Sequence, residues 1–201
     1  MPLVDGTYRL IGDRMPTFTT GFLNTFSYKA WTLSFLLDMR IGGDILNGNE
    51  LYWTTVGLSK RTLDRETPRV LQGVLNDGLQ NTANPTRNTI AFTPYFYQSY
   101  YTDFALADNF MERGVNWLWL RDITLRYSLP ASNLSNSKVF SSFSAFITCT
   151  DPMVFTNYSG FNPNGNGNTP GTRGVGSFGI DFGTLPNPLG FNFGVSVGFK
   201  N

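Results

Sequence analysis

A strict alternation of side chains over residues 30–41 is the feature that most constrains the fold. One set of positions carries large apolar side chains: Trp31, Leu33, Phe35, Leu37, Met39 and Ile41. The other set is Ala30, Thr32, Ser34, Leu36, Asp38 and Arg40. A helix cannot use a period of two, whereas successive side chains of a strand point to opposite faces. Residues 30–41 are therefore predicted to form a β-strand with one apolar face.

Four further segments share this period. They are residues 18–29, 116–129, 139–149 and 189–199. The first of them meets the strand at residues 30–41 with almost nothing between the two, which predicts a tight antiparallel hairpin. The last sets large apolar residues against glycine and small polar ones. We therefore predict an all-β, antiparallel fold of about five strands.

The segment Asn116–Pro130 (NWLWLRDITLRYSLP) has aromatic residues near both ends, as strands of outer-membrane barrels do. Its apolar phase changes at Arg121-Asp122, from even positions to odd ones. A β-bulge, or a strand that leaves one environment for another, produces such a change. We predict that Ile123, Leu125 and Tyr127, which follow the change, face lipid.

The connections between the five segments alternate between short and long. The long ones cover residues 42–115 and 150–188. The first is expected to hold one short helix near residues 58–75, and the Gly-, Asn- and Pro-rich run 162–176 is expected to be a surface loop. Short periplasmic turns alternate with long extracellular loops in outer-membrane barrels, whereas a soluble sandwich has no reason to sort its connections. This pattern favours a membrane barrel whose C-terminus lies in the periplasm.

Five strands cannot close a barrel by themselves. The smallest membrane barrels have about eight strands, and an open sheet would leave unpaired backbone groups in lipid. The chain is therefore predicted to be part of a large transmembrane β-barrel, incomplete on its own.

Composition excludes several classes of function. Charged residues are 14% of the 201, against about 25% in an average soluble domain. The net charge of +1 comes without a basic patch for nucleic acid. Histidine is absent and Cys149 is the only cysteine, so His-based catalytic triads, His-ligated zinc and internal disulfides are excluded. We predict that the chain is not an enzyme and needs no cofactor or metal.

Several motifs, in order over roughly residues 5–199, resemble SusC/RagA-type TonB-dependent outer-membrane transporters. NWLWLRDITLRYSLP resembles the family signature F-L-R-L-R-D-[IV]-T-L-x-Y-[ST]-L-P. TGFLNTFSYKAWTLSFLLDMRIGGDILNG is similar to a family hairpin, and VLQGVLNDG to a loop segment, V-x-x-G-V-x-x-D-G. NYSGFNPN and GIDFGTLPNP resemble a further loop. The sequence departs from the family at Cys149-Thr150-Asp151, where Gly-Gln-Asn is common.

The resemblance implies a barrel of about 22 strands around an N-terminal plug, a known architecture. The chain matches only the last strands, so we expect the plug and the remaining barrel to lie outside it, in the same or another polypeptide. The resemblance further implies import of glycans or peptides, driven by TonB through the plug. A SusD-like lipoprotein would cover the extracellular mouth as a lid.

Aromatic residues in the first long connection are candidate contacts for substrate or lid: Tyr52, Trp53, Tyr95, Tyr97, Tyr100 and Tyr101. Packing among the loops is the alternative reading. Five residues of the wall are expected to face outer-membrane lipid: Trp31, Phe35, Phe191, Phe193 and Val195. Trp117 and Trp119 are expected near the outer membrane interface. Four charged residues are expected to point toward plug or lumen: Asp38, Arg40, Asp122 and Arg126.

Two other functions stay open on the sequence. One is a non-transporting accessory or secretion-complex component of an outer-membrane barrel. The other is a soluble β-rich carbohydrate-binding module, which would remain folded and monomeric in buffer.

Overall fold

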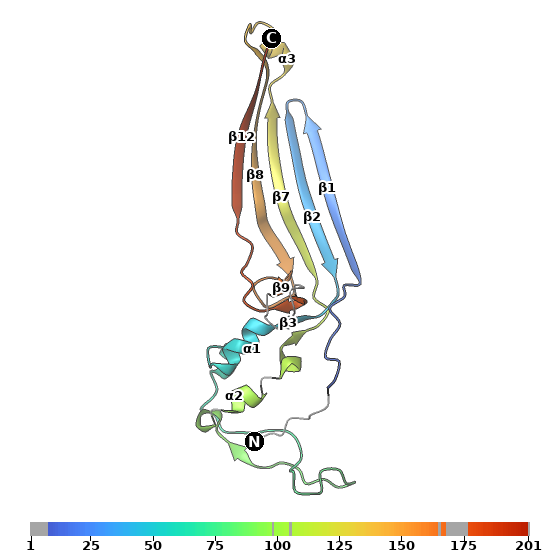
Figure 1. Cartoon of the computed structure of the whole chain (residues 1–201), viewed down its shortest axis with the longest axis vertical. Helices are drawn as coiled ribbons and strands as arrows, with labels where there is room; N and C mark the ends of the chain where they lie inside the picture. Colours follow the sequence, from blue (N-terminus) through green and yellow to red (C-terminus); the bar gives the residue numbers. More distant parts are fainter. Residues whose placement is uncertain (1–7, 98, 105, 165, 168–176, 201) are drawn as a thin grey trace. The chain divides into compact units, whose positions relative to one another are not determined.

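The computed structural model describes residues 8–97, 99–104, 106–164, 166–167 and 177–200 (Figure 1). The chain divides into two compact units. The loop unit comprises Met1–Gly12 and Leu46–Met111, and the strand unit comprises Asp13–Ile45 and Glu112–Asn201. Much of the predicted surface loop at 162–176 lies outside the described residues.

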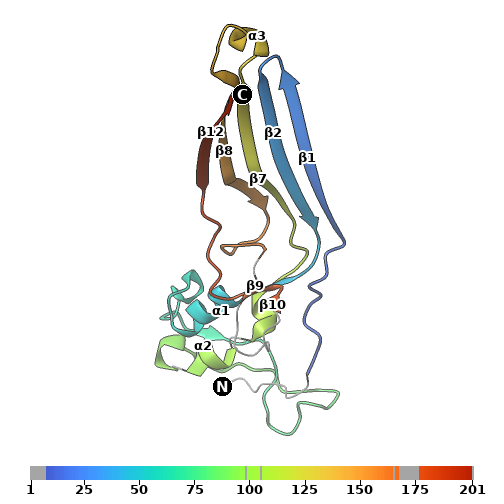
Figure 2. The same ribbon diagram turned by 45° about the horizontal axis from the view of Figure 1, so that its top comes forward.

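The strand unit is built on one five-stranded antiparallel sheet of order β1-β2-β7-β8-β12, whose strands lie side by side in both views (Figures 1 and 2). The strands are β1 (Phe18–Tyr28), β2 (Trp31–Ile41), β7 (Trp117–Ser128), β8 (Phe140–Thr156) and β12 (Gly190–Phe199). This confirms the predicted fold class. Strand β8 continues past residue 149, where the alternation suggested its end, so the second long connection starts later than expected.

The register places most of the large apolar side chains of the five strands on one face of the sheet. One row across the strands consists of Phe26, Leu33, Leu125, Ile147 and Phe193. A row on the opposite face consists of Thr25, Ser34, Thr124, Thr148 and Asn192. We call these the apolar face and the polar face. Large side chains of the apolar face are open, since Phe193 is 85% exposed, and a continuous apolar surface of this kind marks a contact with lipid or a partner.

An aromatic cluster occupies the end of the apolar face where the connections are short. Tyr28, Trp31 and Tyr127 form one row, and the rings of Trp31 and Tyr127 are 4.8 Å apart. The Phe140 and Phe199 rings meet at 5.7 Å near the same end. Aromatic residues at this position match the girdle that membrane barrels place at a lipid–water interface.

Of the two explanations for the phase change, the structure confirms the bulge, at Arg121. The register between β2 and β7 shifts there, so that Leu36 and Leu37 face Asp122 and Leu120. As a result Leu120 lies on the apolar face together with Ile123, although the two belong to different phases of the sequence.

Trp117 and Trp119, which are expected near the outer membrane interface, are not on the apolar face. They lie on the polar face opposite Arg40 and Asp38, and they are only 6% and 4% exposed. The bulge is the physical reason, because it inverts the side-chain phase between the start and the end of β7.

The first long connection contains short elements: β3 (Ile45–Asn47), α1 (Gly48–Thr55), η1 (Lys60–Thr62), β4 (Arg69–Val70), β5 (Ala91–Phe92), η2 (Pro94–Phe96), α2 (Ser99–Phe104), η3 (Ala107–Phe110) and β6 (Met111–Glu112). The helix expected near 58–75 is not there. Leu58 and Leu63 are each 76% exposed, so that stretch has no apolar face to bury. The helix forms earlier, as α1, where the Asn47 side chain caps it by accepting a hydrogen bond from Glu50 N at 3.0 Å.

The remaining connections are compact. Lys29 and Ala30 join β1 to β2, with Lys29 at a φ of 53°. Helix α3 (Ala131–Leu134) follows β7, and β9 (Asn166–Gly167), β10 (Ser177–Phe178) and β11 (Ile180–Asp181) lie in the second long connection. Among the described residues, no helix has the length and apolarity needed to cross a membrane.

Candidate functional site

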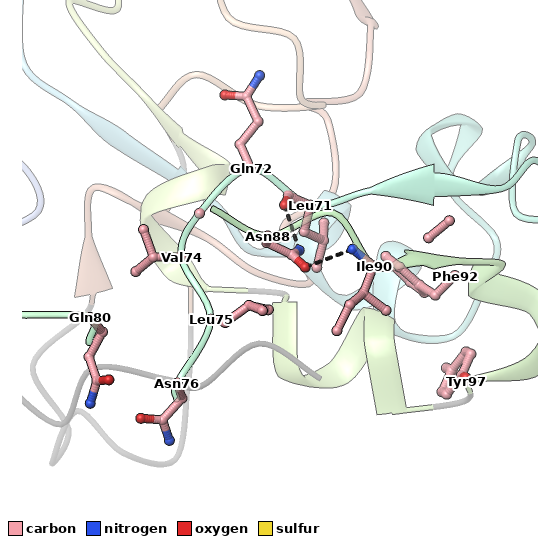
Figure 3. Close-up of a pocket in the computed structure, with 12 residues that line it drawn as sticks. Leu71, Gln72, Val74, Leu75, Asn76, Gln80, Asn88, Ile90, Phe92 and Tyr97 are labelled. Atoms are coloured by element: carbon pink, nitrogen blue, oxygen red, sulfur yellow. Dashed lines mark hydrogen bonds between the residues drawn. The ribbon is translucent and has the colours of Figure 1, made fainter. Parts of the chain in front are cut away.

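The loop unit contains a pocket of about 510 Å³ between the two arms of a hairpin (Figure 3). Its lining residues are Leu71, Gln72, Gly73, Val74, Leu75, Asn76, Gln80, Asn88, Ile90, Ala91, Phe92 and Tyr97. None of these twelve side chains carries a charge. Apolar side chains with a few carboxamides suit an uncharged ligand, because an unpaired ionic group would lose its hydration there.

The two arms of the hairpin are paired along the pocket. Strands β4 and β5 pair at one end, and Leu75 N donates to Thr86 O at 2.8 Å at the other. Between them Asn88 N donates to Gly73 O at 2.9 Å, and the Asn88 side chain adds further bonds. Its amide donates to Leu71 O at 2.8 Å, and its oxygen accepts from Ile90 N at 3.0 Å (Figure 3).

The structure brings three of the six candidate aromatic residues together around Phe92. Tyr97 lines the pocket and contacts the Phe92 ring edge-on at 5.8 Å. Tyr100 is only 4% exposed and packs against Phe92 at 5.0 Å and Tyr101 at 4.9 Å. The Arg69 guanidinium lies 5.9 Å from the Tyr100 ring. Tyr100 and Tyr101 therefore pack behind Phe92 without lining the pocket themselves. Tyr97 is the candidate residue that lines the cavity.

The other three candidates lie outside the pocket lining. Tyr52 and Trp53 are on α1, the first exposed and the second half-buried. Tyr95 is exposed on η2 and its ring packs against Phe96 at 5.4 Å.

The Tyr101 hydroxyl is buried without a hydrogen-bond partner in the described structure, and burial raises the pKa of its phenol.

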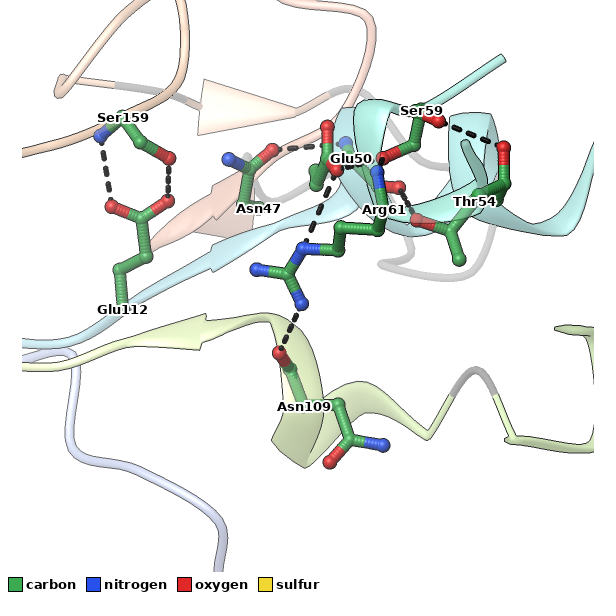
Figure 4. A network of polar contacts seen from close by, with 9 residues as sticks. Asn47, Glu50, Thr54, Ser59, Arg61, Asn109, Glu112 and Ser159 are labelled. Atoms are coloured by element: carbon green, nitrogen blue, oxygen red, sulfur yellow. Dashed lines mark hydrogen bonds and ion pairs between the residues drawn. The ribbon is translucent and has the colours of Figure 1, made fainter. Parts of the chain in front are cut away.

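A polar network fixes α1 within the loop unit (Figure 4). Glu50 accepts a short hydrogen bond from the Ser59 hydroxyl and forms an ion pair with Arg61 at 3.5 Å. Arg61 also donates to Asn109 O at 3.2 Å and lies over the Phe110 ring at 5.0 Å. These contacts tie the start of the connection to its end. They orient the helix that carries Tyr52 and Trp53.

In the strand unit, Arg121 forms the centre of a charged cluster on the polar face. Its Nε donates to Asp38 Oδ2 at 3.1 Å, and its Nη1 lies 3.6 Å from Asp151 Oδ1. The guanidinium is 4.1 Å from the Trp119 ring and 5.5 Å from the Trp117 ring. One residue thus links β2, β7 and β8 at the bulge. The expectation that Asp38 points away from the apolar face is met through this contact.

The end of β2 is organised around a buried arginine. Arg40 is 2% exposed, donates to Gly42 O at 3.1 Å and to Arg14 O at 2.9 Å, and lies 4.8 Å from the Phe178 ring. Gly43 has a φ of 88°, and a Cβ there would collide with the Arg40 guanidinium. A glycine is required at this close approach.

A buried tyrosine joins the two ends of the second long connection. The Tyr158 hydroxyl donates to Asp181 Oδ2 at 2.8 Å, and Asp181 is fully buried. Burial, assisted by the Asp181 carboxylate, raises the pKa of the Tyr158 phenol. Tyr158 packs with Ile45 and Val115, and Gly160 lies against its ring so closely that a Cβ would collide.

Neighbouring contacts reinforce this junction. Ser159 N donates to Glu112 Oε2 at 2.8 Å, and the Ser159 hydroxyl donates to the same carboxylate (Figure 4). Sequence reasoning did not identify the Tyr158–Asp181 pair. Its only sequence signal is that NYSG and GIDFG both stand in motifs of the resembled family. No cluster of metal-ligating side chains exists in the part of the chain that the structure describes.

No family model matches the chain. It is 26% identical over 193 residues to the TonB-dependent receptor P3 of Formosa agariphila. This alignment covers 95% of the present chain and 17% of that protein. Solved structures of the RagAB peptide importer are similar at 18% identity. The open-open state gives a TM-score of 0.56 over 91% of this chain and 17% of that one, and the closed-closed state gives 0.58 over 94% and 18%.

The fold is therefore that of a segment of a TonB-dependent outer-membrane β-barrel. The comparisons confirm the resemblance to the SusC/RagA-type transporters that the sequence motifs indicated. The chain spans about one sixth of the length of the proteins it matches. These relatives are a receptor and transporters rather than enzymes.

Proposed function

We propose that this chain forms part of the barrel wall of a TonB-dependent importer of glycans or peptides, and that its long connections contact substrate and lid. The observation that carries the proposal is the five-stranded sheet with one continuous apolar face and one polar face. The apolar face would contact lipid, and the polar face would line the lumen or contact the plug.

The dimensions of the sheet support a membrane-spanning role. From Trp31 to Ile41 the strand rises by ~33 Å at ~3.3 Å per residue. A tilt of ~40° reduces this to a height of ~25 Å, which is the apolar band of outer-membrane barrels. The Tyr28, Trp31 and Tyr127 row would then mark the periplasmic interface. The C-terminal strand β12 would end in the periplasm.

The proposed partners follow from the same arrangement. Strands β1 and β12 are the free edges of the sheet, and the remaining barrel strands would pair with them. The plug would lie against the polar face and connect the transporter to TonB. A SusD-like lipoprotein would cover the extracellular connections.

We assign substrate contact first to Tyr97, because it is the candidate that lines the pocket of the loop unit. Tyr52, Trp53 and Tyr95 would contact the lid or substrate from positions outside that pocket. Tyr100 and Tyr101 would act by positioning the wall around Phe92.

Uptake of labelled glycans and peptides by cells that carry the complete transporter tests the function. We expect uptake of one class, and we expect loss of TonB to abolish it. Tyr97→Ala should lower uptake several-fold, whereas Leu63→Ala, which removes a more exposed side chain outside the pocket, should not. Uptake that persists without TonB would exclude the importer, and a complex that assembles without transporting either class would favour the accessory role.

A further inference from the structure

The first arm of the hairpin in the loop unit leaves its outer strand edge unpaired. The two arms keep one antiparallel register from the Val70–Ala91 pair to the Val74–Arg87 pair. Along an antiparallel strand, the N–H and C=O groups of successive residues point to opposite edges. Residues 71, 73 and 75 therefore direct their backbone groups to the second arm, and residues 72, 74 and 76 direct theirs away from it.

The hydrogen bonds follow this alternation. Gly73 O and Leu75 N bond to the second arm, at 2.9 Å and 2.8 Å. The backbone N–H and C=O groups of Gln72 and Val74 have no hydrogen bond within the part of the chain that the structure describes. Both residues are exposed, so these backbone groups are accessible to a further strand.

The composition of the first arm does not protect its edge. Natural proteins block exposed strand edges with proline or charged residues, and residues 70–76 (VLQGVLN) contain neither. The second arm carries Pro85 and Arg87, which disfavour pairing along its own outer edge. A two-stranded ribbon is only marginally stable in water, so a third strand on the first arm would also stabilise the hairpin.

The adjoining pocket determines which side chains an added strand can carry. Leu71 and Leu75 lie on one face of the hairpin, with Gly73 between them (Figure 3). A Cβ at Gly73 would meet nothing within 4 Å, so the space beside it is open to a side chain from a neighbouring strand. The pocket lining is uncharged, and Arg69 at the start of the arm is paired with Asp64 at 2.9 Å. An uncharged, apolar side chain suits this space.

We propose that residues 71–76 bind an extended, uncharged peptide segment of the substrate by adding it to the hairpin as a third strand. Its backbone would bond to Gln72 and Val74, which are separated by the ~7 Å that two residues span in any extended peptide. One apolar side chain of the peptide would enter the space beside Gly73, in the pocket that Tyr97 lines. The inference rests on the proposed function and deepens it, because it selects peptides. A glycan has no repeating pair of N–H and C=O groups to match the edge.

Peptide binding to the complete transporter tests the inference on the unmodified protein. The probe is a capped peptide with one central leucine among serine and threonine residues, and calorimetry compares it with versions N-methylated at alternate residues. Methylation in one phase removes the N–H donors from one edge of the peptide strand. We expect one phase to weaken binding about tenfold, through the loss of backbone hydrogen bonds, and the other phase to leave it unchanged. Equal affinities of the two methylated peptides would overturn the proposal.

Val74→Pro and Arg87→Pro are a matched pair of variants. Each removes an outward N–H at the same level of the hairpin, the first on the proposed edge and the second on the opposite edge. Val74→Pro should weaken peptide binding about tenfold, whereas Arg87→Pro should leave it unchanged. Equal weakening by both would overturn the role of this edge. Where Val74→Pro fails to assemble, the methylated peptides still decide the question.

Further outcomes separate this inference from the proposed function. Import of a neutral oligosaccharide with no binding of the peptide would overturn the inference and leave the importer intact. Protection of the Gln72 and Val74 amides from hydrogen exchange before peptide is added would show that the lipoprotein or another part of the transporter already occupies the edge, and would also overturn it. Uptake that persists without TonB, together with normal peptide binding, would overturn the proposed function alone.

Discussion

Tyr158 shows how one side chain can hold a long connection in place. Its hydroxyl donates to the fully buried Asp181, which lies 23 positions further along the chain. The aromatic ring fills the space between Ile45, Val115 and the backbone of Gly160. Both the hydrogen bond and the packing are lost when this connection opens.

We predict that Tyr158→Phe lowers the free energy needed to open this connection by ~1–2 kcal/mol at pH 8. The reason is that a buried carboxylate loses one hydrogen bond. The difference depends on pH. The folded-state pKa of Tyr158 is raised, so its contribution to stability is complete below the unfolded value of about 10 and is lost above it, by ~1.4 kcal/mol per pH unit. The unmodified protein should therefore weaken from pH 10 to pH 11 more steeply than the variant does.

The measurement is the rate at which an alkaline-active protease cleaves beside the Tyr158–Asp181 pair, at residues 157–161 and 180–185, at pH 8, 10 and 11. Between pH 10 and pH 11 the unmodified protein should gain about fivefold in its open population relative to the variant. Equal pH dependence of the two proteins would show that the Tyr158 phenol is not protected in the folded state.

Arg121 is the second residue on which the strand unit depends. Arg121→Met should lower the stability of the assembled barrel by ~1–3 kcal/mol, because Asp38 and Asp151 lose their shared cation while remaining partly buried. The readout is the temperature at which the barrel loses its compact mobility on a gel. Arg126→Met is the control, since that guanidinium lies over the Phe146 ring, at 5.2 Å. Equal melting of the two variants would contradict the role assigned to the bulge.

At the scale of elements, the glycines of β12 are explained by packing against the neighbouring strand β8. On the polar face, Gly190, Gly194 and Gly198 lie where a Cβ would meet side chains of β8, namely Thr150, Phe146 and Ser142. The alternation of large and small residues therefore has a packing cause as well as a membrane one. The small residues leave room for the larger side chains of the adjacent strand.

Gly194→Val should destabilise the sheet by ~1–3 kcal/mol, because it overpacks against the Phe146 ring, which also contacts Arg126. Ser196→Val lies two positions along on the same face and is exposed, so it should change stability little. The gel melting temperature measures both. Unchanged stability of Gly194→Val would contradict the predicted overpacking and would mean that the Phe146 side chain can adopt another conformation.

At the scale of the whole molecule, each unit has its own internal contacts. We therefore expect a change in the loop unit to leave the folding of the strand unit unaffected. Replacing the exposed hairpin tip at residues 76–86 by a short Gly-Ser linker should leave barrel assembly unchanged, since no hydrogen bond of the main sheet is lost. Deleting Arg121 should prevent assembly, because it would turn Trp117 and Trp119 toward the apolar face. Heat-modifiable mobility distinguishes the two, and failure of both would show that the units depend on each other.

Local patterns in the sequence were enough to predict the sheet. Alternation is a property of neighbouring residues, so it located the strands, the apolar face and the phase change at Arg121 without knowledge of their partners. The same reasoning failed for the helix expected near 58–75. There the capping side chain of Asn47 and the lack of a buried face, rather than composition, decided where a helix forms.

The sequence by itself determined that this chain folds into amphipathic antiparallel strands, because period-two patterning specifies one face of a strand from within. Only the tertiary structure decided which face Trp117 and Trp119 occupy, because the register with β2 is set across the sheet. It also decided that Tyr97 reaches a pocket and Tyr100 does not, and that Tyr158 meets Asp181. Those contacts join residues that are remote in sequence, and a local sequence pattern contains no information about such contacts.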